Sequence, residues 1–378
     1  MKIAYYAPMK PIDHPTPSGD RRMARAFFQL LQDLGHDVYP ISKFRSYEGA
    51  GSAANQARVR QQAEKERHHI LAAIQDSEQT PNLWFTYHAY HKSPDWLGPE
   101  VCNVLGIPYV VAEASFAEKQ RNGRWQLGHE RMVHTVNTAD QLLAMTRVDA
   151  EGLQRIVRFD TVRSFPPFIG KARYAESTGR QTLRQELVHR YKLDTAVPWI
   201  LTVAMMRDDV KFQSYGLMIE TLALLKDEEW HWLIVGDGDR RFDIEGQCRQ
   251  RLDDRFTMLG PACSERLGHF YMAADMFGWP ALKEAYGMVL LEAQSFGLPV
   301  IAGRQGGVED VLVDQETGML VNATKNELAE GIGLLLRDPR RRTRLGNAAA
   351  YRIHRHHDIA VAKARMKIAL QAAFQSRG

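Results

Sequence analysis

The chain has 378 residues, of which 44% are hydrophobic and 25% are charged, and its formal net charge is +4. This length suggests about two domains, each with enough apolar residues for an ordinary core. No stretch approaches the roughly 20 uninterrupted apolar residues that cross a bilayer, so we expect no membrane span. The mild positive charge is compatible with an anionic substrate or membrane surface, and by itself it does not indicate nucleic-acid binding.

The cysteines and the N-terminal residues bear on the compartment. Cys102, Cys248 and Cys263 lie far apart, with neither the even number of a disulfide framework nor the spacing of a zinc site. The apolar run at residues 3–7 is too short for a signal peptide and predicts a strand. We therefore expect a cytoplasmic protein with reduced thiols.

Short apolar runs alternate with helical periodicities along the first 160 or so residues. Strands are expected at residues 3–7, 38–41, 83–86, 109–112 and 142–145. Helices are expected at residues 20–34, 53–74, 99–105 and 126–136. This alternation predicts a parallel sheet with helices on both faces.

A break follows at residues 164–170, where two prolines and a glycine indicate a linker between domains. The alternation then restarts. Strands are expected at residues 199–204, 231–235, 256–259, 276–279 and 299–302, and late helices at residues 326–336, 340–350 and 359–374. We therefore predict an α/β protein of two doubly wound domains facing each other across a cleft, with ligands beyond the carboxyl ends of the strands.

The most informative stretch is residues 279–321, which contains two glutamates eight positions apart, Glu284 and Glu292. One carboxylate could meet a sugar, and the other could accept both hydroxyls of a ribose through charge-assisted hydrogen bonds. The alternative is an amphipathic helix that carries two solvated glutamates.

Gly287 is unfavourable inside a helix, so we expect a helix to begin there. The backbone N–H groups of Gly287, Met288 and Val289 would then form an anion site suited to a diphosphate.

This stretch resembles the E-x7-E element of the retaining GT-B glycosyltransferases of family 4, also called group 1 glycosyltransferases. The similarity includes the opening E-A-Y-G, the helix end F-G-L-P-V, the loop G-G-V-E-D and the turn E-T-G-M-L. It implies a GT-B fold with a Rossmann-like acceptor domain at residues 1–168 and a Rossmann-like donor domain at residues 169–357. It also implies a C-terminal helix, at residues 358–378, that crosses back onto the first domain.

The resemblance implies a role for each residue of the donor site. Arg207 and Lys211, after the first strand of the second domain, would hold the donor diphosphate without a metal ion. Glu284 would engage the sugar and Glu292 the ribose. The family's lysine usually stands one residue further from the arginine and precedes a glycine, whereas Phe212 follows Lys211 here. The alternative for both cations is an ordinary charged surface loop.

Two places in the first domain carry further candidates. The segment Pro17-Ser18-Gly19-Asp20 is similar to the family's glycine-rich loop, in which Gly19 would approach the donor phosphates. Its alternative is a plain helix N-cap.

Glu113 stands where many relatives have a histidine near the sugar and the acceptor hydroxyl. It could orient either substrate, or it could be a structural carboxylate bonded to a helix N-terminus. His88 and His91 follow the preceding strand and point to the same rim, although surface histidines with hydrogen bonds are the alternative.

Other patterns do not predict sites. Asp237-Gly238-Asp239 matches a D-x-D metal motif by letter, but its G-D-G turn is typical of the family, so we predict no metal. The histidine-rich run at residues 354–357 is expected to be solvated charge between two helices. The chain lacks G-x-G-x-x-G after its first strand and lacks a P-loop. The basic stretch at residues 45–67 is expected to be a solvated helix, with a peripheral contact at the inner membrane face as the alternative.

The resemblance implies a metal-independent hexosyltransferase with no cofactor, acting in bacterial polysaccharide biosynthesis. Its donor would be a UDP-, GDP- or ADP-sugar, and its acceptor a glycan, a lipid-linked molecule or a small molecule. A sugar-nucleotide 2-epimerase of the same fold and a catalytically silent nucleotide-sugar-binding protein remain as alternatives.

Overall fold

The computed structural model describes residues 1–16, 18–77, 80–170 and 179–377. Pro17 of the predicted glycine-rich loop therefore lies outside the described residues, as do positions 171–178 of the predicted second domain and Gly378 of the C-terminal helix. The chain divides into two compact units: unit 1 comprises Met1–Pro166 with Ile359–Gly378, and unit 2 comprises Pro167–Asp358. The division falls two residues before the boundary expected from the sequence.

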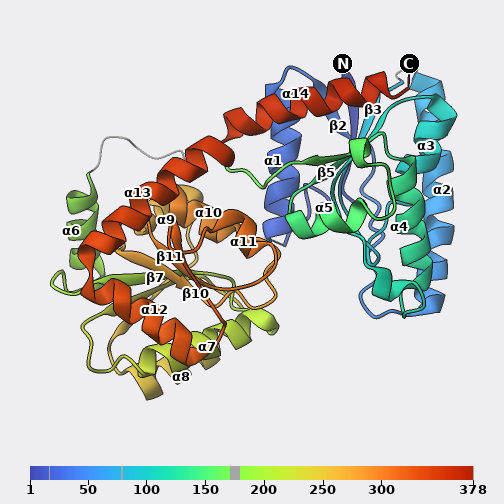
Figure 1. Cartoon of the computed structure of the whole chain (residues 1–378). Coiled ribbons are helices and arrows are strands. Elements are labelled where there is room, and N and C mark those ends of the chain that lie inside the picture. Colours follow the sequence, from blue (N-terminus) through green and yellow to red (C-terminus); the bar gives the residue numbers. More distant parts are fainter. Residues whose placement is uncertain (17, 78–79, 171–178, 378) are drawn as a thin grey trace. The chain divides into compact units, whose positions relative to one another are not determined.

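Unit 1 is built on a six-stranded parallel sheet in the order β2-β1-β3-β4-β5-β6 (Figure 1). Its strands are β1 (Lys2–Tyr6), β2 (Asp37–Pro40), β3 (Leu83–Ala89), β4 (Tyr109–Ala114), β5 (Gln141–Ala144) and β6 (Val162–Ser164). All residues of β4 and β5 are buried, as expected for central parallel strands covered on both faces. The sequence-based assignment missed β6, because its three residues directly precede the proline-rich break.

The helices of unit 1 connect these strands. They are α1 (Gly19–Asp33), α2 (Ala53–Ser77), α3 (Gly98–Leu105), α4 (Gln126–Thr138), α5 (Arg147–Leu153) and α14 (Ile359–Gln375), with short 3-10 turns η1 (Glu118–Gln120) and η2 (Phe159–Thr161). The last helix, α14, contacts α1, β4 and β5, so the end of the chain is part of unit 1.

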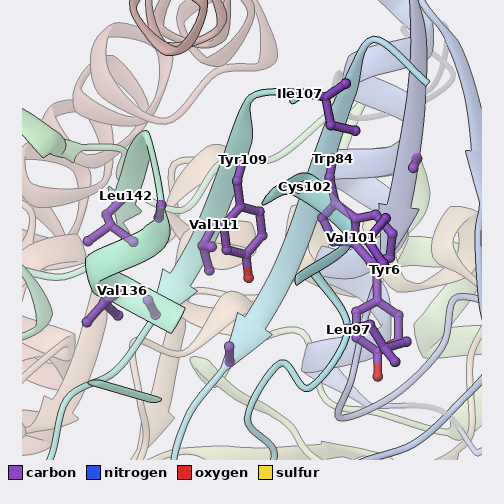
Figure 2. Close-up of a cluster of buried hydrophobic side chains, with 14 of the residues drawn as sticks. Tyr6, Trp84, Leu97, Val101, Cys102, Ile107, Tyr109, Val111, Val136 and Leu142 are labelled. Carbon is purple, nitrogen blue, oxygen red and sulfur yellow. The ribbon is translucent and has the colours of Figure 1, made fainter. Parts of the chain in front are cut away.

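The core of unit 1 contains large aromatic side chains. Tyr6, Trp84 and Tyr109 are completely buried with the apolar residues of α3 (Figure 2). A buried carboxylate, Asp95, fastens this region, because it accepts hydrogen bonds from the Thr86 and Tyr109 hydroxyls and from two backbone N–H groups at the start of α3. These contacts tie the middle of β3 to the amino end of β4 and to the start of α3.

Unit 2 is a second six-stranded parallel sheet, in the order β12-β11-β10-β7-β8-β9. Its strands are β7 (Trp199–Val203), β8 (His231–Val235), β9 (Phe256–Gly260), β10 (Met276–Trp279), β11 (Val300–Gly303) and β12 (Gly318–Val321). This order is that of the dinucleotide-binding Rossmann fold. The predicted α/β class with two doubly wound sheets is thus confirmed.

The helices of unit 2 are α6 (Arg180–Tyr191), α7 (Val210–Ala223), α8 (Arg241–Leu252), α9 (Ser264–Ala273), α10 (Met288–Ser295), α11 (Val308–Val311), α12 (Lys325–Arg337) and α13 (Pro339–His356). The expectation of solvated charge in the histidine-rich run is confirmed for His354, Arg355 and His356, which are exposed in the last turn of α13, and is wrong only for His357. Helix α13 continues to His356, and His357 is buried with its Nδ1 2.7 Å from the Pro167 carbonyl. No helix among the described residues has the length and apolar character of a membrane span.

Candidate functional site

The strand order of unit 2 reverses between β7 and β10, which lie side by side although two other strands separate them in the sequence. In open parallel sheets, ligands bind at such a switch point, beyond the carboxyl ends of the strands. The loop after β7 carries Arg207 and leads into α7 with Lys211, and the loop after β10 carries Glu284. The fold therefore brings three predicted site residues to the position where a ligand is expected.

Lys211 and Glu284 form an ion pair through Nζ and Oε2, although 73 positions separate them in the sequence. Lys211 lies in the first turn of α7, whose N-cap Asp209 accepts the Lys211 backbone N–H at 2.7 Å. The Lys211 ammonium group also lies 5.7 Å from the ring centroid of Trp279, the last residue of β10. Sequence reasoning named both charges but not their pairing.

Arg207 lies on a loop that two glycines of the next crossover support. The Met206 backbone N–H donates to the Asp237 carbonyl at 2.9 Å. A Cβ on Gly236 would stand 1.9 Å from the Ala204 carbonyl oxygen, and one on Gly238 would stand 2.5 Å from the Met206 carbonyl oxygen. These close approaches explain the G-D-G turn as a support for the Arg207 loop. The Arg207 guanidinium itself lies 2.8 Å from the Met205 sulfur.

Helix α10 begins where the sequence predicted, with Gly287 as N-cap in a left-handed conformation, φ +75°. A Cβ there would meet Leu290 at 2.9 Å and the Glu284 side chain at 3.3 Å, so only glycine fits without strain. The first N–H groups of a helix have no acceptor within it. Those of Met288 and Val289 therefore remain candidates for an anion next to Glu284.

Glu292, predicted to bind a ribose, lies within α10 and is only 4% exposed. Its Oε2 accepts a hydrogen bond from the Tyr271 hydroxyl at 3.0 Å, and the Tyr271 ring stacks on Phe296 at 5.4 Å. The side chain is thus held in a defined position. Its role toward a ribose stays a prediction.

The candidates of unit 1 gather at the carboxyl ends of β1, β3 and β4. Ser18 is the N-cap of α1 and accepts the Arg21 backbone N–H at 3.2 Å, so the capping alternative is realised at this position. Gly19 opens the helix and has open space around its Cα. Its predicted approach to phosphate stays a prediction.

Asp20, His88 and Glu113 converge. The His88 Nδ1 lies 3.1 Å from an Asp20 carboxylate oxygen and 4.0 Å from Glu113 Oε1. The Tyr87 hydroxyl donates to the other Glu113 oxygen at 2.6 Å. Glu113 is therefore part of a buried cluster whose members the sequence named one by one.

The charges of this cluster shift each other's pKa values. Burial alone would lower the pKa of His88, but the carboxylates of Glu113 and Asp20 raise it to about 9. Burial raises the pKa of Glu113 above its ordinary value, although His88 opposes the shift. His91 is different: burial and the neighbouring Lys92 lower its pKa to about 4, and its ring lies edge-on to Trp125.

Asp237 and Asp239 of the D-x-D match do not converge with other potential ligands. Among the described residues, three potential metal ligands from histidine, cysteine or carboxylate side chains come within 4.8 Å of one another only at Asp20, His88 and Glu113. The Asp237 Oδ1 instead lies 3.8 Å from Arg241 Nη1, and it accepts the Gly238 backbone N–H at 2.9 Å.

Comparison with known proteins agrees with this geometry. Residues 201–352 match the family of glycosyl transferases group 1. This stretch runs from β7 into α13 and includes the switch point and both glutamates. The match confirms, over residues 201–352 of unit 2, the resemblance to group 1 glycosyltransferases that was inferred from the sequence.

The chain is similar to curated relatives at modest identity. The chain is 30% identical over 238 residues to a D-inositol 3-phosphate glycosyltransferase from Xylanimonas cellulosilytica, which covers 59% of this chain and 54% of the relative. It is 25% identical over 285 residues to a protein of the same name from Pseudarthrobacter chlorophenolicus. This alignment covers 70% of this chain and 65% of the relative. The chain thus matches between half and two thirds of the length of these relatives.

Solved structures resemble the whole chain. A sucrose-phosphate synthase from Thermosynechococcus elongatus has a TM-score of 0.74 at 20% identity and covers 99% of this chain and 100% of its own. HepE from Anabaena, solved in complex with UDP-glucose, has a TM-score of 0.68 at 17% identity. The match covers 98% of this chain and 100% of the HepE chain. At these identities the likeness establishes the fold, which is GT-B.

Proposed function

We propose that the protein is a retaining glycosyltransferase that takes its sugar from a nucleotide diphosphate sugar bound to unit 2. The observation that supports this most directly is the meeting of Lys211, Glu284 and the N-terminus of α10 at the switch point of the sheet. A cation, a carboxylate and free backbone N–H groups suit a ligand that joins a diphosphate to a polyhydroxylated ring.

In this proposal the two ends of the donor bind different residues. Lys211, Arg207 and the backbone N–H groups of Met288 and Val289 neutralise the diphosphate, so that no metal ion is needed on the leaving group. Glu284 accepts hydroxyls of the sugar, and Glu292 accepts those of the ribose.

The reaction follows from these positions. The bond between the anomeric carbon and the β-phosphate oxygen breaks, and the acceptor oxygen forms a bond on the same face of the ring. The acceptor proton passes to the departing phosphate, a route that needs no separate base on the protein. Arg207 and Lys211 stabilise the negative charge that develops on that phosphate.

UDP-sugars are the first donors to test, because the Anabaena neighbour was solved with UDP and with UDP-glucose. The relatives' name gives D-inositol 3-phosphate as one small acceptor to include. Glycans and lipid-linked molecules complete the panel, and GDP- and ADP-sugars are compared with UDP-sugars.

The test is to incubate the protein with each nucleotide sugar, with and without acceptors, and to follow the release of nucleoside diphosphate. We expect slow hydrolysis of one donor class, faster release with a true acceptor, and retained anomeric configuration in the product. An epimerase would instead change the sugar of the intact donor. If no donor is bound or consumed, the proposal is wrong and a non-catalytic role remains.

A further inference from the structure

We propose that Asp20, His88 and Glu113 form a binding site for one divalent transition-metal ion in unit 1. All three ligands belong to unit 1, and metal binding does not depend on the proposed transferase activity. It departs from the expectation, drawn from the sequence, that the chain holds no metal.

Three ligand atoms from three segments meet at this point. Asp20 comes from the first turn of α1, His88 from the end of β3 and Glu113 from the end of β4. One ligand atom of each lies within 4.8 Å of the others. A histidine nitrogen with two carboxylate oxygens is a mixed donor set that suits ions such as Zn²⁺, Fe²⁺ and Mn²⁺.

The orientation of the imidazole favours a shared ligand over a simple ion pair. The His88 Nδ1 is buried, and no hydrogen-bond partner within the described chain is aligned with it, although Asp20 Oδ1 is 3.1 Å away. The nitrogen faces both carboxylates, since it lies 3.1 Å from Asp20 Oδ1 and 4.0 Å from Glu113 Oε1. An ion between the three groups would satisfy all of them.

The surroundings of Glu113 resemble the outer shell of a metal site. The Tyr87 hydroxyl holds Oε2 at 2.6 Å, and Oε1 is the oxygen that faces His88. Hydrogen bonds of this kind orient metal-ligating carboxylates. Asp95 offers a contrast, because its oxygens accept four hydrogen bonds from the core and leave no face for a ligand.

The backbone beneath the cluster is unusual. His88 and Glu113 occupy adjacent positions of paired strands, between the Tyr87–Ala112 and Ala89–Ala114 partners. Both have a left-handed conformation, with φ of +59° and +56°. Such conformations cost energy for residues other than glycine and concentrate at functional sites. The fold therefore turns these two side chains toward Asp20 at a local cost.

The position in the sheet also favours a ligand site. The strand order of unit 1 reverses at β1, which lies between β2 and β3. Asp20 follows β1 and His88 ends β3, so the cluster lies at the switch point of unit 1, where parallel sheets bind ligands.

The test is calorimetric titration of the metal-stripped full chain with Zn²⁺, supported by the visible spectrum of bound Co²⁺. It should use a Cys263→Ser background, because the exposed Cys263 thiol could bind zinc by itself. We expect one saturable equivalent. Asp20→Asn, His88→Asn and Glu113→Gln should each weaken binding at least about tenfold, since each removes a direct ligand. Asn is chosen at position 88 because it tolerates positive φ.

His91→Asn is the matched control: it removes a histidine from the same strand end but outside the cluster, and binding should persist. Circular dichroism melting verifies that each variant is folded. Asp20→Asn is decisive if the others unfold, because its side chain is 30% exposed. The proposal is overturned if the parent binds no saturable equivalent, or if binding survives Asp20→Asn. UDP titration in EDTA reports on unit 2 independently.

Discussion

If unit 2 binds the proposed donor, the ion pair between Lys211 and Glu284 would couple the binding of its diphosphate to that of its sugar. Each side chain is partly exposed, at 26% and 20%, so an incoming ligand can reach both. A diphosphate that attracts Lys211 would release the Glu284 carboxylate toward the sugar hydroxyls. The pair therefore keeps both charges compensated until a ligand arrives, which avoids an unpaired charge in a partly buried site.

Glu284→Ala tests this coupling. Removal of the carboxylate frees Lys211 for phosphate, so the affinity for UDP should stay the same or increase. Turnover should fall by at least about a hundredfold, because the sugar is no longer positioned. Titration with UDP and a hydrolysis rate measure the two effects. If UDP binding were lost while turnover persisted, the assigned role of Glu284 would be wrong.

At the scale of elements, the Asp275 carboxylate anchors α6 to the rest of unit 2. Asp275 accepts from Arg184 at 2.8 Å and from the Trp199 backbone N–H at 2.7 Å, and the Arg184 guanidinium lies 3.9 Å from the Trp199 ring centroid. Burial alone would raise the pKa of Asp275, but the Trp199 N–H and Arg184 hold it below the ordinary value.

Asp275→Asn should lower the free energy of unfolding by about 3 kcal/mol at neutral pH, because Arg184 loses its carboxylate partner in a largely buried position. A carboxyl group with a lowered pKa stabilises the fold above its unfolded pKa and loses this effect as the pH falls through its folded value. The difference between parent and variant should thus be constant above about pH 4 and shrink in stronger acid. Urea unfolding at several pH values measures it, and a pH-independent difference would contradict the ion-pair account.

Helix α13 packs closely on the end of α10. A Cβ on Gly346 would stand 1.9 Å from the Gly297 carbonyl oxygen. Gly346→Ala should therefore destabilise the protein by about 1–3 kcal/mol through overpacking. Gly246→Ala in α8 is the matched control: its Cβ would meet nothing within 4 Å, so it should stabilise by about 0.5–1 kcal/mol. Equal effects of both changes in thermal unfolding would refute this packing argument.

For the whole molecule, periodicity in the sequence was enough to place most strands and helices of both sheets. A buried strand such as β8 stands out because its residues 232–235 are a continuous apolar run. The very short β6 could not be placed, because three residues carry no periodicity. The end of α13 could not be placed, because a run of histidines is typical of a polar surface. The order of the strands is set by packing, and no local sequence pattern predicts it.

The candidate site shows the same division between local and long-range information. The motif around Glu284 predicted the helix start at Gly287 correctly, because a left-handed N-cap is a local property of glycine. The pairing of Lys211 with Glu284 and the convergence of Asp20, His88 and Glu113 depend on which strands become neighbours. Both the ion pair and the cluster lie near the point where the strand order of their sheet reverses. This position is the signal from which they could have been predicted.

The central claim, a nucleotide-diphosphate site at the switch point of unit 2, is tested most directly by calorimetric titration with UDP in EDTA. We expect the parent to bind one equivalent without metal. Arg207→Ala and Glu292→Ala should each weaken binding about tenfold or more, the cost of a charge-assisted hydrogen bond of roughly 1.5–3 kcal/mol. The control is Glu245→Ala in α8, where the carboxylate pairs with Arg249, and this variant should bind UDP as the parent does. Unchanged binding in both site variants, or binding that requires a metal ion, would contradict the account.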